Sequence, residues 1–289
     1  MTIIKVLVED IDPMLFNSLR AAIAVTISIP FIIMALRKIN KRNLTYAIAA
    51  GLCMAVATSS AIYALTFVQA SYVIILSLLS PVVFVILSNK LMHEKINARS
   101  AAGVSVAAIG ALLAVSLPLL LGGETSMEFS PIATTLVLIS CFFFPLGLIF
   151  YRKAHESGMP FPAIQGISSS VILVISFTTM YVTVGIPLEQ LNGLPVSAWI
   201  GILYSAIVVI FIARIMSMAS LERIGASAYS TISYLENIIA IIIPVLFLGE
   251  KLSVAVIVGG MLILVGVYLT EHHRSKHHPH IRTLAQHNH

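Results

Sequence analysis

Long, nearly uninterrupted apolar segments dominate the chain, and short polar gaps separate them. A helix that crosses the hydrocarbon core of a bilayer needs about 20 mostly apolar residues. Backbone groups in lipid must find their hydrogen-bond partners within the segment, so apolar runs of this length predict transmembrane helices. The predicted spans are 13–36, 44–67, 71–91, 99–120, 131–151, 162–184, 195–219, 227–248 and 253–270.

Composition supports lipid as the solvent of this chain. Hydrophobic residues make up 58% and charged residues only 10%, whereas a soluble domain carries roughly 25% charged residues. The net charge of +5 could indicate a nucleic-acid partner, but the basic residues lie in short gaps and in the tail, and no arm or helix face collects them. We therefore expect the lipid bilayer as a partner and no nucleic acid.

Basic residues alternate between crowded and nearly empty gaps. One set of gaps, with the C-terminal tail, holds thirteen Lys and Arg residues, whereas the alternate set holds only Lys5 and Lys251. An excess of basic residues marks the cytoplasmic side. The pattern predicts a multi-pass protein of the cell membrane (plasma or bacterial inner membrane) with a cytoplasmic C-terminus. The thirteen are Arg37, Lys38, Lys41, Arg42, Lys90, Lys95, Arg99, Arg152, Lys153, Arg223, Arg274, Lys276 and Arg282.

The chain contains an internal duplication. Residues 70–110 align without a gap on residues 226–266 at an offset of 156, which places a Glu-Lys pair and two glycines in register. Glu94 falls in a predicted cytoplasmic gap and its counterpart Glu250 in an external one, so the two units are inserted in opposite orientations. Inverted repeats are typical of secondary transporters, whose substrate site lies between the halves. The aligned glycines are Gly103 and Gly110 in the first unit and Gly259 and Gly266 in the second.

The predicted fold class is an all-α membrane protein with two inverted five-helix repeats around a central cavity. Residues 1–121 form the first repeat with four spans, residues 122–271 form the second with five, and residues 272–289 form a His-rich cytoplasmic tail. The first repeat is expected to lack its opening helix. A His-rich tail can bind metal, but a disordered basic tail is the preferred interpretation, and no metal site is predicted.

The sequence resembles the drug/metabolite transporter superfamily, in its ten-span EamA-like branch. The resemblance covers essentially the whole chain and implies two bundled five-helix repeats that export metabolites, often amino acids or drug-like compounds. Two departures are the absent first span and Asn237, which stands where the family often has proline. The residues that carry the resemblance are Pro13 with Arg20; Ala64-Leu65, Ala70-Ser71, Ser80-Pro81 and Glu94; and the segments 221–226, 234–236 and 248–251.

Glu236 is the main candidate for chemistry at membrane depth. It lies nine residues into its predicted span, a rise of about 14 Å, near the middle of the bilayer. An acid at that depth is expected to face the bundle interior or water. We predict that Glu236 binds a substrate amine or a coupling proton; a protonated structural Glu beside Asn237 is the alternative. Further residues predicted to line this site are Ser230, Ser233, Tyr234 and Asn237, with Ser77 and Ser80 in the first repeat.

Four other polar residues lie within the predicted spans. Arg214 is expected either to reach the headgroups or to serve the site, by pairing with Glu236 or by lining the inner vestibule. Tyr63 and Tyr204 are candidate cavity aromatics. For Arg20 we favour a structural role, with its side chain extending to the headgroups.

The sequence favours a secondary transporter of a small-molecule substrate. It has no nucleotide-binding loop and no predicted cofactor. An intramembrane enzyme needs several catalytic side chains at membrane depth, whereas the predicted spans hold one lone Glu and no His, so the sequence does not favour an enzyme. A non-transporting or truncated membrane scaffold is the alternative, and a homodimer is left open.

Overall fold

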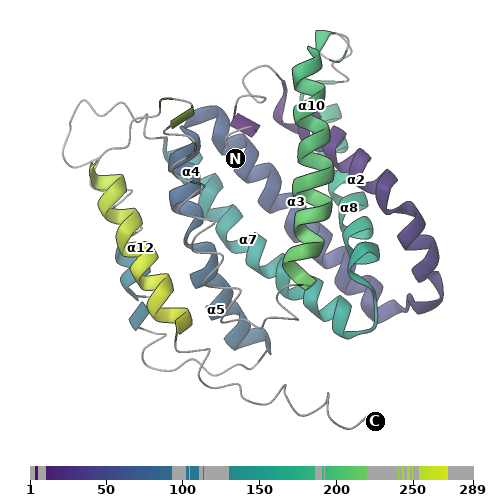
Figure 1. The fold of residues 1–289 in the computed structure, drawn as a ribbon, viewed down its shortest axis with the longest axis horizontal. Coiled ribbons are helices and arrows are strands. Elements are labelled where there is room, and N and C mark those ends of the chain that lie inside the picture. The colour runs from purple at the N-terminus through teal and green to yellow at the C-terminus, as the bar shows by residue number, and fades with distance from the viewer. Residues whose placement is uncertain are drawn as a thin grey trace.

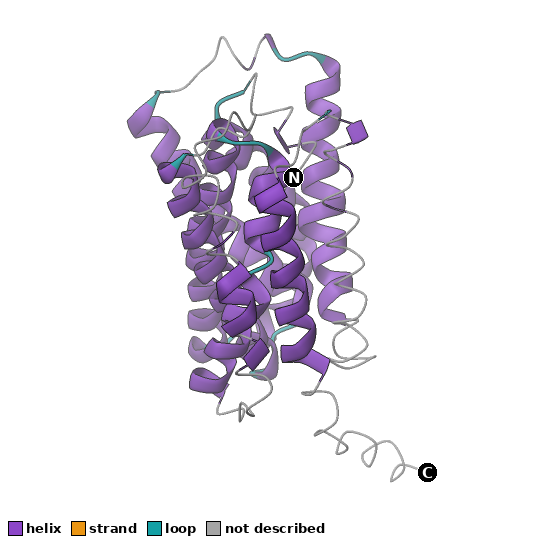
Figure 2. Cartoon of the chain, turned by 90° about the vertical axis from the view of Figure 1, so that its left-hand side faces the viewer, coloured by secondary structure: helices purple, strands orange, loops and turns teal. Residues whose placement is uncertain are grey.

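The computed structural model describes residues 4–5, 11–92, 102–103, 105–110, 113, 130–185, 191, 193–219, 240, 243, 246–247, 249 and 254–272. Throughout these ranges every regular element is a helix, and the helices pack side by side in one bundle (Figure 1). In the view turned by 90°, the long helices run in roughly one common direction, as the spans of a single membrane do (Figure 2). The chain is therefore an all-α membrane protein, as the apolar pattern predicts.

Five of the described helices are long and apolar enough to cross a membrane. Their ends agree with the predicted spans to within a few residues, while the predicted spans 99–120 and 227–248 lie mostly outside the described residues. The elements are α2 (Pro13–Ala35), a 3-10 turn (Leu36–Lys38), α3 (Lys41–Phe67), α4 (Ala70–Ser77), α5 (Ser80–Met92), α7 (Pro131–Glu156), α8 (Phe161–Thr183), α10 (Val196–Tyr204), the π-helix η2 (Ser205–Ala213) and α12 (Val254–His272).

Local sequence signals fix where the helices around the site begin. The Asp12 carboxylate accepts hydrogen bonds from the amides of Met14 and Leu15 at 2.9 and 3.0 Å, and Pro13 occupies the first turn of α2. Asn40 and Asn43 form a reciprocal capping box at the start of α3. Both devices satisfy amides that have no partner within the helix.

The third predicted span is not one continuous helix. The structure interrupts it at residues 78–79, where the amides of Leu78 and Leu79 bond to carbonyls three residues back, at 3.2 and 3.0 Å. Pro81 explains the break, because it lacks the N–H that would bond to the Ser77 carbonyl and it disfavours a helical conformation at the preceding residue. The prediction of an uninterrupted helix over 71–91 is wrong at this point.

Two antiparallel helix pairs bring the predicted repeats together. In the pair α2–α8, the Asn17 amide bonds to the Ser176 hydroxyl, whereas Ser28, further along α2, packs against Gly166, nearer the start of α8. A Cβ on Gly166 would lie 2.5 Å from Ser28 Cβ, so this contact needs a residue without a side chain. The pair α3–α7 lies beside it (Figure 1) and completes the side of the bundle that holds the site.

The aligned glycines of the two repeats pack against one another. A Cβ on Gly110 would lie 2.7 Å from the Gly259 carbonyl oxygen, and one on Gly266 would lie 2.5 Å from the Gly103 carbonyl oxygen. The order of these contacts is reversed, so the two helices run antiparallel. The alignment makes Gly110 equivalent to Gly266 and Gly103 equivalent to Gly259. A two-fold axis between the repeats would therefore convert the contact of Gly110 with Gly259 into the contact of Gly266 with Gly103. This is the geometry expected of inverted repeats, although Glu94 and Glu250 themselves lie outside the described residues.

Candidate functional site

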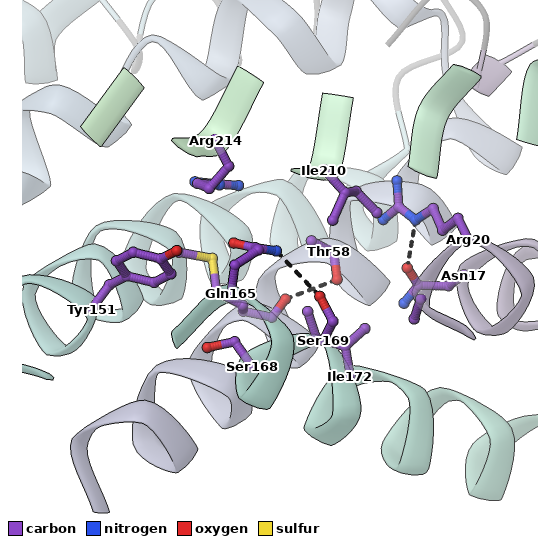
Figure 3. Close-up of a pocket in the computed structure, with 12 residues that line it drawn as sticks. Asn17, Arg20, Thr58, Tyr151, Gln165, Ser168, Ser169, Ile172, Ile210 and Arg214 are labelled. Atoms are coloured by element: carbon purple, nitrogen blue, oxygen red, sulfur yellow. Dashed lines mark hydrogen bonds between the residues drawn. The ribbon is translucent and has the colours of Figure 1, made fainter. Parts of the chain in front are cut away.

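A narrow cavity lies between helices of the two predicted repeats (Figure 3). Its volume is about 30 Å³, enough for about two water molecules. The first repeat contributes residues of α2 and α3, and the second contributes residues of α7, α8 and the η2 region. The lining residues are Asn17, Arg20, Ala21, Met54, Thr58, Tyr151, Gln165, Ser168, Ser169, Ile172, Ile210 and Arg214.

Most of the residues that line the cavity have polar side chains, and two of them carry positive charge. Eight of its twelve residues are polar, two of them are arginines, and none of the twelve is acidic. In Figure 3, Arg20 and Arg214 lie on either side of Ile210, opposite the polar residues of α8. An arginine within the membrane costs about 2.5–3.5 kcal/mol on insertion scales, so two on one cavity make it the candidate functional site.

Arg20 is held inside the bundle. Its side chain is 4% exposed, and its Nε donates a 2.8 Å hydrogen bond to Asn17 Oδ1. The guanidinium carbon lies 5.2 Å from the centre of the Phe16 ring, a distance typical of a cation–π contact. The expectation that Arg20 extends to the headgroups is therefore wrong: neighbouring helices enclose it, and its charge faces the cavity.

Asn17 orients Arg20 by joining three helices. Its amide nitrogen donates to Ser176 Oγ of α8 at 2.7 Å and to Ser59 Oγ of α3 at 3.3 Å. These donations leave the amide oxygen facing Arg20, one helical turn further along α2. Because the Asn17 side chain is fully buried, breaking this network would leave polar groups without partners at a cost of about 1–3 kcal/mol each.

The α8 side of the cavity presents a hydroxyl with a proton to donate. Gln165 Nε2 donates to Ser169 Oγ at 3.2 Å, so that oxygen is the acceptor and its own proton stays available. The Ser168 hydroxyl instead donates to the Ala47 carbonyl of α3 at 3.3 Å, and the Thr58 hydroxyl donates to the Met54 carbonyl at 2.8 Å. Ser169 is thus the serine best placed to donate to a guest in the cavity.

Arg214 approaches the cavity from the end of a π-helix. It follows η2 directly, and Ile210, within η2, also lines the cavity. The Arg214 guanidinium carbon lies 4.9 Å from the centre of the Phe144 ring of α7. π-Helices are rare and occur frequently at functional sites, and this one places its C-terminal end beside the cavity.

The predicted site residues are placed as follows. Arg214 lines the cavity, whereas Tyr63 packs in an apolar cluster at the start of α2 and Tyr204 is 45% exposed. Ser77 donates to the Val73 carbonyl within α4, and Ser80 lies against the Cys141 thiol. Their roles in substrate binding stay predictions. Glu236, Asn237, Ser230, Ser233 and Tyr234 lie outside the described residues.

Sequence reasoning did not select Asn17, Thr58, Gln165, Ser168 or Ser169. A buried Asn or Gln inside an apolar span was the available signal, because such amides are expensive in lipid unless they have partners. Serine and threonine gave no signal, since their hydroxyls can bond to the carbonyl of the preceding helical turn. Over the part of the chain that the structure describes, no group of three or more His, Cys, Asp or Glu residues could hold a metal ion.

Comparison with known proteins agrees with this architecture. The model of the EamA-like transporter family matches residues 1–116 and 131–271. A solved structure titled only "Crystal structure of protein" is 16% identical to this chain with a TM-score of 0.56; the alignment covers 90% of this chain and 89% of that one. At this identity the likeness shows the fold alone. No curated protein matches the sequence significantly.

Proposed function

This chain belongs to the EamA-like transporter family and is a multi-pass membrane transporter of the drug/metabolite type, and we propose that it exports small metabolites, such as amino acids or drug-like compounds, by alternating access. The proposed membrane is the plasma or bacterial inner membrane, with the C-terminus in the cytoplasm. This orientation is supported by the thirteen basic residues on one predicted side of the membrane against two on the other. Coupling would come from an ion gradient or from solute exchange.

The observation that carries the proposal is the cavity between the two predicted repeats, lined by two arginines and six other residues with polar side chains. Helices α2 and α3 supply one wall, and α7, α8 and η2 supply the other. Secondary transporters of inverted-repeat architecture bind substrate at such an interface and rock one half against the other. A cavity of about 30 Å³ is too small for a metabolite, so substrate binding requires these walls to move apart.

Glu236 is proposed as a second element of the substrate path. The acid is predicted at membrane depth, where it is expected to face the bundle interior. There it would bind a substrate amine or carry a coupling proton.

A counterflow screen in proteoliposomes tests the proposed function. Purified full-length protein would be screened with amino acids, amines and nucleosides, and at least one of them should exchange faster than in protein-free vesicles.

The matched pair Ser169→Leu and Ser170→Leu tests whether the solute passes through the cavity, because Ser169 lines the cavity and its neighbour Ser170 does not. Leu at 169 should reduce exchange at least about tenfold, a barrier change of about 1.4 kcal/mol, and Leu at 170 should have little effect. Equal transport by both variants would rule out this cavity, and no exchange of any solute would favour a non-transporting scaffold.

A further inference from the structure

The cavity offers hydrogen-bond donors for which the described residues supply no acceptor. A guanidinium has five N–H groups, and Arg20 uses only Nε–H, toward Asn17. Within the described ranges, no hydrogen bond or ion pair joins the two terminal nitrogens of Arg20 to an acceptor. The Ser169 hydroxyl on the opposite wall also has a proton to donate. A guest that fits these groups is an acceptor and not a donor.

Charge points to the same kind of guest. Arg20 and Arg214 face one cavity, and none of the described residues that line it is acidic. Opposite charges attract more strongly in a membrane interior than in water, because the local dielectric constant is low. An anion at the terminal nitrogens of Arg20 forms charge-assisted hydrogen bonds, which are roughly twice as strong as neutral ones.

The two arginines lie at different depths along the same path. Arg20 is seven residues from the start of α2, a rise of about 10 Å, and Arg214 is five residues from the opposite end of its span, about 8 Å. α2 and the α10–η2 span run parallel, because Phe16 packs with Ile202 near their beginnings and Phe31 contacts Phe211 near their ends. Arg20 and Arg214 therefore lie toward opposite faces of the membrane.

We propose that this cavity, once its walls have moved apart, binds the oxyanion group of a small organic acid, a carboxylate or a phosphate, with Arg20 as the main ligand, Ser169 as a neutral donor and Arg214 as the second cation. Asn17 is a positioning residue: it holds Nε of Arg20 and so aims the terminal nitrogens into the cavity. A bound oxyanion that moves between Arg20 and Arg214 keeps a cationic partner at both depths. This inference rests on the proposed function for its transported solute, whereas binding itself can be measured without transport.

Thermal unfolding of the full-length protein in detergent tests anion binding directly. Cys53 and Cys141 are both buried and free, so a thiol-reactive fluorescent dye reports unfolding when they become accessible. The probes are benzoate and succinate, their neutral amides benzamide and succinamide, and inorganic phosphate, all at constant ionic strength. A ligand that binds only the folded state raises the melting temperature. The acids should do so and the amides should not, while the phosphate arm distinguishes a general oxyanion site from one specific for carboxylates.

Three variants locate the site. Arg20→Gln should weaken the apparent affinity for the stabilising anion at least about tenfold, whereas Arg37→Gln, which removes an exposed cation at the end of α2, should leave it unchanged. Asn17→Asp places a carboxylate next to Arg20 Nε, where Asn17 Oδ1 now lies at 2.8 Å. This internal anion should compete with the added acids and remove their effect while the protein stays folded.

The outcomes separate this inference from the proposed function. Equal stabilisation by acids and amides, no stabilisation by any anion, or an Arg20→Gln protein with wild-type affinity would overturn the oxyanion site. If Arg20→Gln does not fold, Asn17→Asp decides: lost stabilisation supports the site and wild-type stabilisation overturns it. Anion binding without counterflow would leave the site standing and reject transport. Counterflow of neutral or cationic solutes alone, without anion binding, would support transport and reject the oxyanion site.

Discussion

The glycine contact between the repeats gives the most direct test of the inverted architecture. Gly266 lies so close to the facing helix that an added Cβ would be 2.4 Å from the Ala107 amide nitrogen and 2.5 Å from the Gly103 carbonyl oxygen. Ordinary contacts of a Cβ begin at 3.4 Å. Both obstructing atoms belong to the backbone and cannot rotate away, so Gly266→Ala must push the two helices apart by about 1 Å.

The energetic cost follows from this displacement. Overpacking by one methyl group costs about 1–3 kcal/mol when the surroundings cannot relax, and the better helix propensity of Ala recovers up to about 1 kcal/mol. We therefore expect Gly266→Ala to lose about 1–2 kcal/mol. Gly110→Ala should lose a similar amount, because its Cβ would meet the Gly259 oxygen and the Ile263 nitrogen, each at 2.7 Å. Similar losses are expected of two contacts that a two-fold axis maps onto each other.

Thermal unfolding followed through Cys53 and Cys141 measures these losses. A loss of 1–2 kcal/mol corresponds to a lowering of the melting temperature by a few degrees, about 2–4 °C per kcal/mol for a chain of 150–250 residues. The matched control is Gly260→Ala in the same helix, where the added Cβ would meet only the flexible Ile75 side chain, at 3.3 Å. If Gly266→Ala and Gly110→Ala melt at the same temperature as Gly260→Ala, the close contact between the repeats does not exist and the argument for a two-fold axis is lost.

Two other predictions test the topology and the candidate acid. In a background that lacks Cys53 and Cys141, single cysteines introduced as Glu94→Cys and Glu250→Cys should react with a membrane-impermeant thiol reagent from opposite sides of the bilayer; reaction from one side would mean that the repeats are not inverted. Glu236→Gln should reduce counterflow and abolish its pH dependence, because the substrate amine or coupling proton loses its carboxylate, and wild-type transport by this variant would show that Glu236 is structural.

The sequence alone determined which segments become helices, and it predicted how they are inserted. Segment length and hydropathy are local properties, and lipid imposes internal hydrogen bonding on each segment, so predicted spans such as 44–67 and 162–184 match α3 and α8 closely. Charge counts and the offset of 156 predicted an inverted duplication, and the antiparallel glycine contacts have the geometry that such a duplication requires. The break near Pro81 could also have been predicted from the sequence, because proline removes a backbone hydrogen bond within its own helix.

Only the tertiary structure decided which polar residues meet in the cavity. Asn17 bonds to Ser176, 159 residues away, and Arg20, which the sequence placed at the headgroups, turns inward beside it. In a soluble helix an apolar stripe marks the buried face. In a membrane the lipid is as apolar as the core, so an apolar sequence leaves the rotation of each helix about its axis undetermined. Close contacts such as Gly166 against Ser28 set that rotation, and with it the side chains that face the cavity.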